Sequence, residues 1–147
     1  MPDFHQTMND LIASCRDSEE GFGKAAKGTR DDNLRNRFIG IARQRADFAD
    51  ELTGEVRAAG GEPAISGHLS GIQHRGWREL ETSIRPKNDM QFIEECTTGE
   101  ENTLRHYEHA LTLDLPESMR SIVERQHLTV QETLLQLRNL EALRSTG

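Results

Sequence analysis

Aromatic residues, cysteine, proline and long apolar runs are all scarce in this chain of 147 residues. It contains one tryptophan, one tyrosine, two cysteines and four prolines. No stretch approaches the roughly 20 consecutive apolar residues that cross a bilayer, so the sequence predicts no membrane segment. Residues 1–10 hold proline, aspartate, histidine and asparagine without an apolar core. We therefore expect no signal peptide and a cytoplasmic location.

Basic residues are also fewer than acidic residues. The chain has 18 lysines and arginines against 25 aspartates and glutamates, which gives a formal net charge of −7. A basic stripe for nucleic acid would lie in a negative field, so we expect no nucleic-acid partner. Cys15 and Cys96 stand among apolar residues and form no CxxC motif. In a cytosolic protein this favours buried free thiols over a disulfide or a redox pair.

The apolar residues of the chain recur with the period of an α-helix. Alanine, leucine, glutamate and arginine are frequent, and apolar residues recur at intervals of three and four. The pattern predicts one domain with four long helices, over about 4–27, 32–59, 89–111 and from the turn at 114–117 to about 143. Gly60-Gly61, followed by Pro63, ends the second helix. A shorter helix is expected between about 66 and 84.

The two halves of the chain correspond at an offset of 81 residues. Cys15 then falls on Cys96, and Glu19-Glu20 falls on Glu100-Glu101. We therefore predict two related helical hairpins, about 4–60 and 89–143, joined by a crossover over 61–88. Together they form an all-α, antiparallel four-helix bundle with a short extra helix. A connector of this length can cross the bundle, so the order need not be up-down-up-down.

Two glutamates fall on the apolar stripes of their helices. Because an ionised carboxylate in a helical core is costly without a partner, Glu19 and Glu100 need one. Arg45 and Gln126 fall on the stripes of the other two helices, and a guanidinium binds a carboxylate through two hydrogen bonds. We predict a metal-free buried polar layer of these four residues. Glu19 and Arg45 differ in height by about 7–8 Å, so two separate pairs remain an alternative.

Five stretches carry a resemblance to a known family. They are Leu11 to Phe22, Gly60-Gly61-Glu62-Pro63, His74-Arg75-Gly76-Trp77, Glu94 to Glu101 and Val123-Glu124-Arg125-Gln126, and together they span nearly the whole chain. On these residues the chain resembles a bacterial family of ferritin-like four-helix proteins known only as a domain of unknown function. The resemblance implies the ferritin-like four-helix-bundle fold and no established reaction.

A metal site is the alternative interpretation of the inward glutamates. Di-iron proteins of this fold use one glutamate on each of two helices and Glu-x-x-His on each of the other two. Here the second motif is absent at the inward positions, and the literal Glu124-x-x-His127 is predicted on an outer face. The alternative is iron or manganese bound by Glu19 and Glu100. The candidate additional ligands are Glu20, Glu101 and His127.

A third hypothesis is an assembly or protein-binding module. Trp77 on the crossover, with the end faces of the bundle, would form a dimer surface or another self-association surface. The sequence contains no Ser-His-Asp, Cys-His or phosphate-loop arrangement. We therefore expect a non-enzymatic cytosolic bundle, structural or stress-related, without a cofactor. Metal binding and assembly are the two alternatives.

Overall fold

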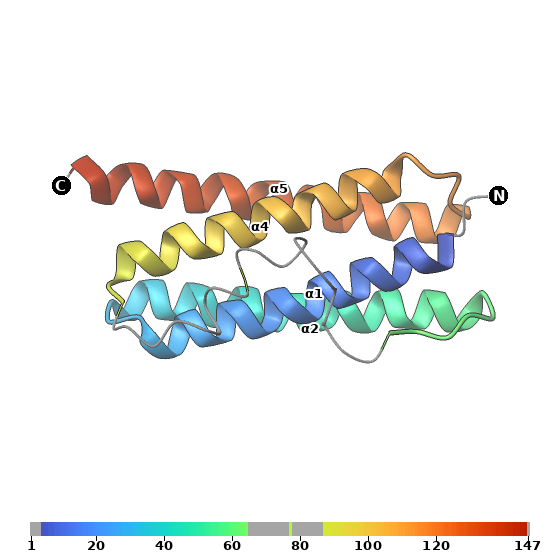
Figure 1. Ribbon diagram of the computed structural model, residues 1–147, viewed down its shortest axis with the longest axis horizontal. Coiled ribbons are helices and arrows are strands. Elements are labelled where there is room, and N and C mark those ends of the chain that lie inside the picture. The colour runs from blue at the N-terminus through green and yellow to red at the C-terminus, as the bar shows by residue number, and fades with distance from the viewer. Residues whose placement is uncertain (1–3, 65–76, 78–86, 147) are drawn as a thin grey trace.

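The computed structural model describes residues 4–64, 77 and 87–146 (Figure 1). Within these residues all regular structure is helical, which confirms the predicted all-α class. The helices are α1 (Phe4–Gly28), α2 (Asp32–Ala58), α4 (Asp89–Leu111) and α5 (Glu117–Thr146). The short helix predicted over about 66–84 lies, apart from Trp77, outside the described residues. None of the helices in the described ranges is apolar enough over its length to cross a membrane.

The four helices lie lengthwise in two antiparallel pairs. α1 packs along α2, α4 packs along α5, and the pairs meet mainly through α1 and α4. α2 and α4 therefore lie across the bundle from one another. They also run in the same direction, because α2 ends at the opposite end of the bundle from the start of α4 (Figure 1). The order is not up-down-up-down.

Local hydrogen bonds explain where the helices begin and end. The Asp31 side chain accepts from the Leu34 amide at 2.8 Å and so caps α2. Asn88 and Gln91 form a reciprocal capping box at the start of α4. Gly60, with φ of 84°, follows the C-cap of α2 in the left-handed region that glycine adopts without strain. The predicted stop at Gly60 is confirmed.

One side chain ties the two helix pairs together at their ends. The Asp89 carboxylate accepts the backbone N–H groups of Arg30 and Asp31 at 2.8 and 3.0 Å. The start of α4 is therefore bound to the turn between α1 and α2. At the other end, the Asn9 side chain bonds the backbone of Glu62 and Ala64, each at 2.9 Å. These contacts hold the start of α4 against the turn between α1 and α2, and the segment after α2 against α1.

Two apolar clusters fill the interior, one towards each end. The first is built around Met8, Leu11, Ile12, Leu52, Val56, Met119 and Val123. The second is built around Phe22, Leu34, Phe38, Trp77, Phe92, Ile93 and Leu137. Buried polar residues at the middle of the helices lie between them, among them Ser18, Arg45, Glu100 and Thr103. The core is thus interrupted by a polar layer.

Trp77 belongs to the second cluster. It is 4% exposed, and its ring centroid is 5.0 Å from that of Phe22. Its ring fits between α1 and α4 only because both helices carry glycine there: an added Cβ would lie 2.1 Å from the ring at Gly21 and 2.3 Å at Gly99. Trp77 is therefore part of the core, which corrects the dimer surface predicted for it.

A buried polar layer as the candidate functional site

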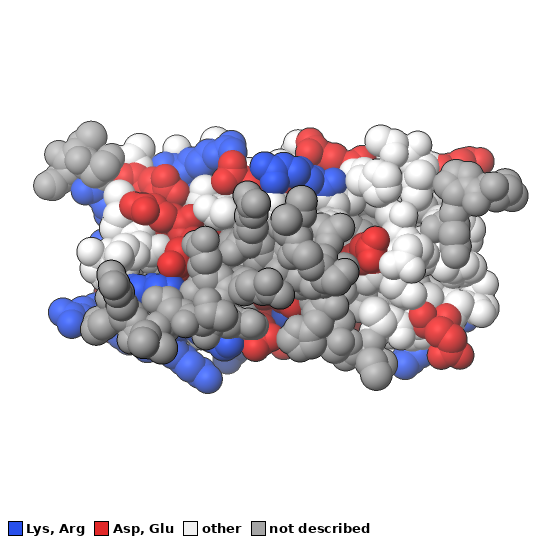
Figure 2. Space-filling view, in the orientation of Figure 1, with Lys and Arg blue, Asp and Glu red and all other residues white. Residues whose placement is uncertain are grey.

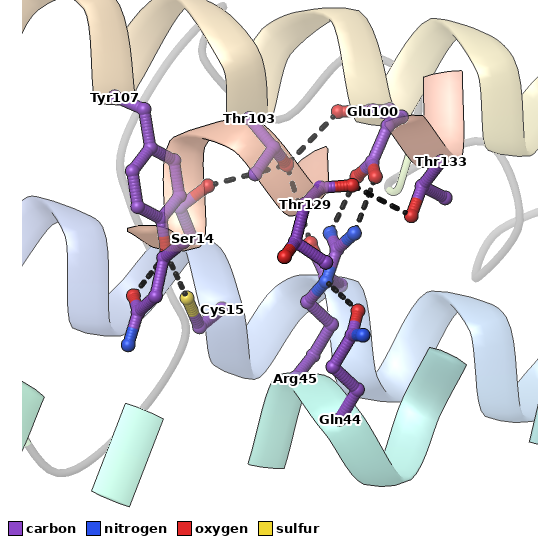
Figure 3. A network of polar contacts seen from close by, with 12 residues as sticks. Ser14, Cys15, Gln44, Arg45, Glu100, Thr103, Tyr107, Thr129 and Thr133 are labelled. Carbon is purple, nitrogen blue, oxygen red and sulfur yellow. Dashed lines mark hydrogen bonds and ion pairs between the residues drawn. The ribbon is translucent and has the colours of Figure 1, made fainter. Parts of the chain in front are cut away.

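Arg45 and Glu100 form an ion pair across the bundle. Arg45 projects from α2 and Glu100 from α4, and both side chains are fully buried. The two guanidinium nitrogens donate to the two carboxylate oxygens at 2.6 and 2.5 Å (Figure 3). The ring centroids of Phe22 and Phe48 each lie 5.8 Å from the guanidinium carbon of Arg45. The pair is therefore enclosed by apolar groups, and Arg45 Nε also donates to Gln44 Oε1 at 3.3 Å.

The protonation of Arg45 follows from this geometry. Burial alone lowers the pKa of a guanidinium, but the charge and hydrogen bonds of Glu100 outweigh it and hold the pKa of Arg45 above its ordinary value. Arg45 thus keeps its charge inside the core. Removal of either partner would leave the other as a buried single charge, which is far more costly than loss of an exposed pair.

A second polar network joins all four helices. The Tyr107 hydroxyl donates to Gln126 Oε1 at 2.6 Å, and Gln126 Nε2 donates to Glu51 Oε1 at 2.8 Å and to the Phe48 carbonyl at 3.4 Å. Cys15 Sγ lies 3.1 Å from the same hydroxyl. Since the phenol has one proton and gives it to Gln126, the thiol is the donor to the phenol oxygen. The network runs from the buried thiol to the half-exposed Glu51.

The thiol and phenol of this network resist ionisation. Burial raises the pKa of Cys15 to about 11, against a smaller lowering by its hydrogen bond with Tyr107. Burial also raises the pKa of Tyr107 and that of Cys96. At neutral pH both thiols are protonated, and both are buried and free, as predicted. A buried protonated thiol is a poor nucleophile.

Small hydroxyls line the contact between α1 and α4. Thr103 Oγ1 lies 3.4 Å from Ser14 Oγ and 3.2 Å from Ser18 Oγ, and it donates to the Gly99 carbonyl at 3.1 Å. These residues are buried. The hydroxyls therefore partner one another.

Glu19 does not lie in the buried layer. Its side chain is 41% exposed and pairs with Arg16 of the same helix at 3.4 Å, while Arg16 also reaches Asp50 at 2.8 Å. Ser18 takes the inward place instead and is fully buried. This corrects the predicted layer, which contains Arg45, Glu100 and Gln126 but not Glu19. The layer consists of an ion pair and a separate amide network, and Glu19 belongs to neither.

Two of the other predicted metal ligands form ion pairs with basic side chains. Glu20 pairs with Lys24 and Glu101 with Arg138, each at 3.3 Å on the surface. His127 is half-buried on α5. No three histidine, cysteine, aspartate or glutamate side chains in the described ranges are placed to hold one metal ion.

The residues present do not fit the di-iron centre of ferritin-like proteins. That centre needs inward carboxylates on all four helices and two histidines. In the described part of this bundle, Glu100 gives both oxygens to Arg45, and Gln126 takes the corresponding inward place on α5. A guanidinium beside a carboxylate competes with a cation for the same oxygens. The buried carboxylate of Glu100 is therefore arranged to bind a guanidinium and not a metal ion.

Tyr107 and Glu51 belong to the site although the sequence pattern did not predict them. The apolar pattern alone gives Tyr107 no polar role, although a buried tyrosine hydroxyl usually needs a hydrogen-bond partner. That need, together with the inward Gln126, was the available signal. Glu51 lies beside the buried stripe of α2, and only the packing of α2 against α5 reveals its bond to Gln126.

An open hollow lies at one end of the bundle, apart from the buried layer. It has a volume of about 820 Å³ and is lined by Arg30, Lys87, Arg144 and the first residues of α4. Figure 2 shows lysine and arginine side chains gathered near the turn between α1 and α2. Arg45 is roughly 20 Å farther along the axis of α2. The hollow and the buried layer are therefore separate features.

Comparison with known proteins identifies a family for this chain, but the description of that family names no activity. The sequence model of a family described as "Domain of unknown function (DUF2383)" matches residues 3–113, which is three quarters of the chain. No curated protein matches the chain.

Proposed function

The chain belongs to the DUF2383 family, whose description states no activity, and we propose that it is a non-enzymatic, ferritin-like structural bundle organised by a metal-free ion pair. The helix directions support the ferritin-like arrangement. α2 and α4 run the same way (Figure 1), which is the consequence of one long crossover between two hairpins. The proposal assigns to the buried layer the task of fixing how the four helices pair.

The carrying observation is the bidentate contact of Arg45 with Glu100. In ferritin-like metalloproteins the inward carboxylates hold a cation that comes from solution. Here the cation is part of the chain, and it binds both oxygens of Glu100 at 2.6 and 2.5 Å. The ion pair can form only if the helices pack so that Arg45 of α2 and Glu100 of α4 face one another in the core. This is how a buried ion pair selects one packing.

The remaining buried polar groups support a structural role. Nucleophilic catalysis needs a nucleophile beside a base that can take its proton. Cys15 bonds Tyr107, and Ser14 and Ser18 bond Thr103, so these groups meet other hydroxyls. With the pKa of Cys15 raised to about 11 by burial, its thiolate is rare at neutral pH.

Metal content tests the proposal directly. The full chain should be purified without a chelating tag, and iron, manganese and zinc should be measured per chain. We expect below about 0.1 equivalent for the wild type, for Glu100→Gln and for the exposed control Glu108→Gln. About one or two equivalents that disappear in Glu100→Gln but not in Glu108→Gln would overturn the proposal in favour of a carboxylate metal site.

Removal of the internal cation tests the structural role. Arg45→Met should lower the free energy of unfolding by about 3–5 kcal/mol, because Glu100 remains as a buried single charge. The partly exposed control Arg16→Met should change it by less than about 1 kcal/mol. The double variant Arg45→Met/Glu100→Leu should recover most of the loss, since no charge stays buried. Urea unfolding followed by circular dichroism measures all three, and no loss in Arg45→Met would refute the pairing.

A further inference from the structure

The Trp77 ring lies against α4 beside the buried ion pair. It packs on Gly99, where an added Cβ would lie 2.3 Å from the ring. Gly99 directly precedes Glu100, which binds Arg45 through both of its carboxylate oxygens. The indole therefore covers α4 one residue away from the buried carboxylate.

The same ring covers α1 next to a second neighbour of the pair. An added Cβ at Gly21 would lie 2.1 Å from the indole. The following residue is Phe22, whose ring centroid is 5.0 Å from that of Trp77 and 5.8 Å from the guanidinium carbon of Arg45. Phe22 is therefore a neighbour of both the indole and the guanidinium.

Neither helix has a side chain of its own at this part of the contact between α1 and α4. Gly21 and Gly99 carry no Cβ, and the indole, which is 4% exposed, occupies the space between them. Loss of the indole would leave an opening beside charged groups. Water enters such a space when polar groups line it, whereas a void with apolar walls stays dry. The Arg45–Glu100 pair would therefore be hydrated in the absence of the indole.

The indole is held in this position by its shape and not by a hydrogen bond. Its Nε1 atom is buried and has no acceptor in the part of the chain that the structure describes. Burial of an N–H group without an acceptor costs free energy, and release into water restores a hydrogen bond. By contrast, hydrogen bonds hold the buried side chains of Arg45, Glu100, Tyr107 and Gln126. Of these five side chains, only Trp77 loses no hydrogen bond when it leaves the core.

We propose that Trp77 is a removable shield of the Arg45–Glu100 pair: its ring excludes water from the pair, and its release hydrates the pair and weakens the contact of α2 with α4. An ion pair is stronger where water is excluded, because the effective dielectric constant is lower there. The inference rests on the proposed function, since it takes this pair as the contact that fixes the helix packing. Metal bound to Glu100 would reject both proposals, whereas a metal-free pair that does not respond to Trp77 would reject only the shield.

The penalty for breaking the pair is the first test. Arg45→Met leaves Glu100 without a partner, and in the wild-type background it should raise the unfolding equilibrium constant roughly a hundredfold or more. In a Trp77→Ala background the same change should have an effect at least about tenfold smaller, because water then solvates the carboxylate. Urea unfolding followed by circular dichroism gives the constants of all four proteins. Equal penalties in the two backgrounds would overturn the proposal.

Phe92→Ala is the matched control for loss of a core ring. The Phe92 ring also packs on a helix glycine, with an added Cβ at Gly28 2.3 Å away, but its charged neighbour is Lys87 and not the buried pair. Phe92→Ala should therefore lower stability and leave the Arg45→Met penalty unchanged. Trp77→Phe keeps a ring at the contact and should retain most of the penalty, and Trp77→Leu replaces Trp77→Ala if the alanine variant does not fold. An equal reduction of the penalty in the Phe92 and Trp77 variants would reject a specific shield.

Thermodynamic linkage provides a second, spectroscopic test. If release of Trp77 hydrates the pair, an unpaired Glu100 must in turn favour release of Trp77, because coupling between two events is reciprocal. Trp77 is the single tryptophan, so acrylamide quenching of its fluorescence measures release in the folded protein. The quenching constant should rise at least about threefold in Arg45→Met, where a single charge stays buried. It should return to the wild-type value in Arg45→Met/Glu100→Leu, which buries no charge. Quenching of Arg45→Met that equals that of the wild type would overturn the proposal.

Discussion

Glu19 of α1 and Glu100 of α4 are both glutamates on helices that pack together, but one is partly exposed and the other is buried. Glu19 is 41% exposed and pairs with Arg16 of its own helix. Glu100 is fully buried and pairs with Arg45 from the helix across the bundle. A carboxylate is therefore buried where an opposite charge can reach it through the core.

The neighbours of the two helices explain the difference. The buried side of α1 includes small residues such as Ser14, Ser18 and Gly21, which allow α4 and Trp77 to approach closely. This contact turns Glu19 towards the edge of the interface. On α4 the corresponding edge is occupied by Glu101, which is paired with Arg138 on the surface. Helix rotation therefore decides which glutamate enters the core.

The same substitution at both glutamates should separate them most. Glu100→Gln leaves the charge of Arg45 buried without a counter-ion and should lower the free energy of unfolding by about 3–5 kcal/mol. Glu19→Gln removes half of a partly exposed pair and should cost less than about 1 kcal/mol. Urea unfolding of the two variants measures both values. Similar losses at the two positions would abolish the contrast between them.

Added methyl groups near the two glutamates should have opposite effects. Gly99→Ala should cost about 1–3 kcal/mol, because the new Cβ would lie 2.3 Å from the Trp77 ring. Gly23→Ala meets no atom within 4 Å and should stabilise the protein by about 0.5–1 kcal/mol through better helix propensity. Thermal unfolding of both variants gives the sign. A stabilising Gly99→Ala would mean that the tryptophan is not held against α4.

Loss of the Tyr107 hydroxyl should have an intermediate effect confined to the amide network. Tyr107→Phe leaves Gln126 Oε1 buried without its 2.6 Å donor and should cost about 1–2 kcal/mol. Thr98→Val removes an exposed hydroxyl and serves as the control, with an expected change within about 0.5 kcal/mol. Chemical denaturation compares the two. If Tyr107→Phe behaves like its control, the network contributes nothing to stability.

Thiol reactivity reports local opening of the structure near each glutamate. Because burial raises the pKa of Cys15 to about 11, native labelling with a thiol reagent at pH 8 should be at least about a hundredfold slower than in the unfolded chain. Glu19→Gln should keep this protection, and Glu100→Gln should weaken it. Mass spectrometry of the labelled cysteines gives the rates. Rapid labelling of the native wild type would contradict the burial of the thiols.

Much of the fold could be predicted because helix boundaries depend on local signals. The starts at Asp32 and Asp89 follow capping residues, and the stop of α2 follows from Gly60. Arg45 and Glu100 were found because a charge within an apolar stripe is conspicuous. Glu19 was misplaced because apolar residues alone set the expected stripe of α1, whereas buried Ser14 and Ser18 rotate its real inner side. Small polar residues such as these do not show in the sequence pattern of apolar residues, although they are buried.

Trp77 gives the protein a built-in optical probe. It is the single tryptophan of the chain and is 4% exposed, so tryptophan fluorescence comes from one indole between α1 and α4. Far-ultraviolet circular dichroism instead averages over all helices. A transition seen by fluorescence before one seen by circular dichroism would identify a species in which the helices persist after the indole has left Gly21 and Gly99. Tryptophan fluorescence therefore distinguishes release of the Trp77 side chain from unfolding of the four helices.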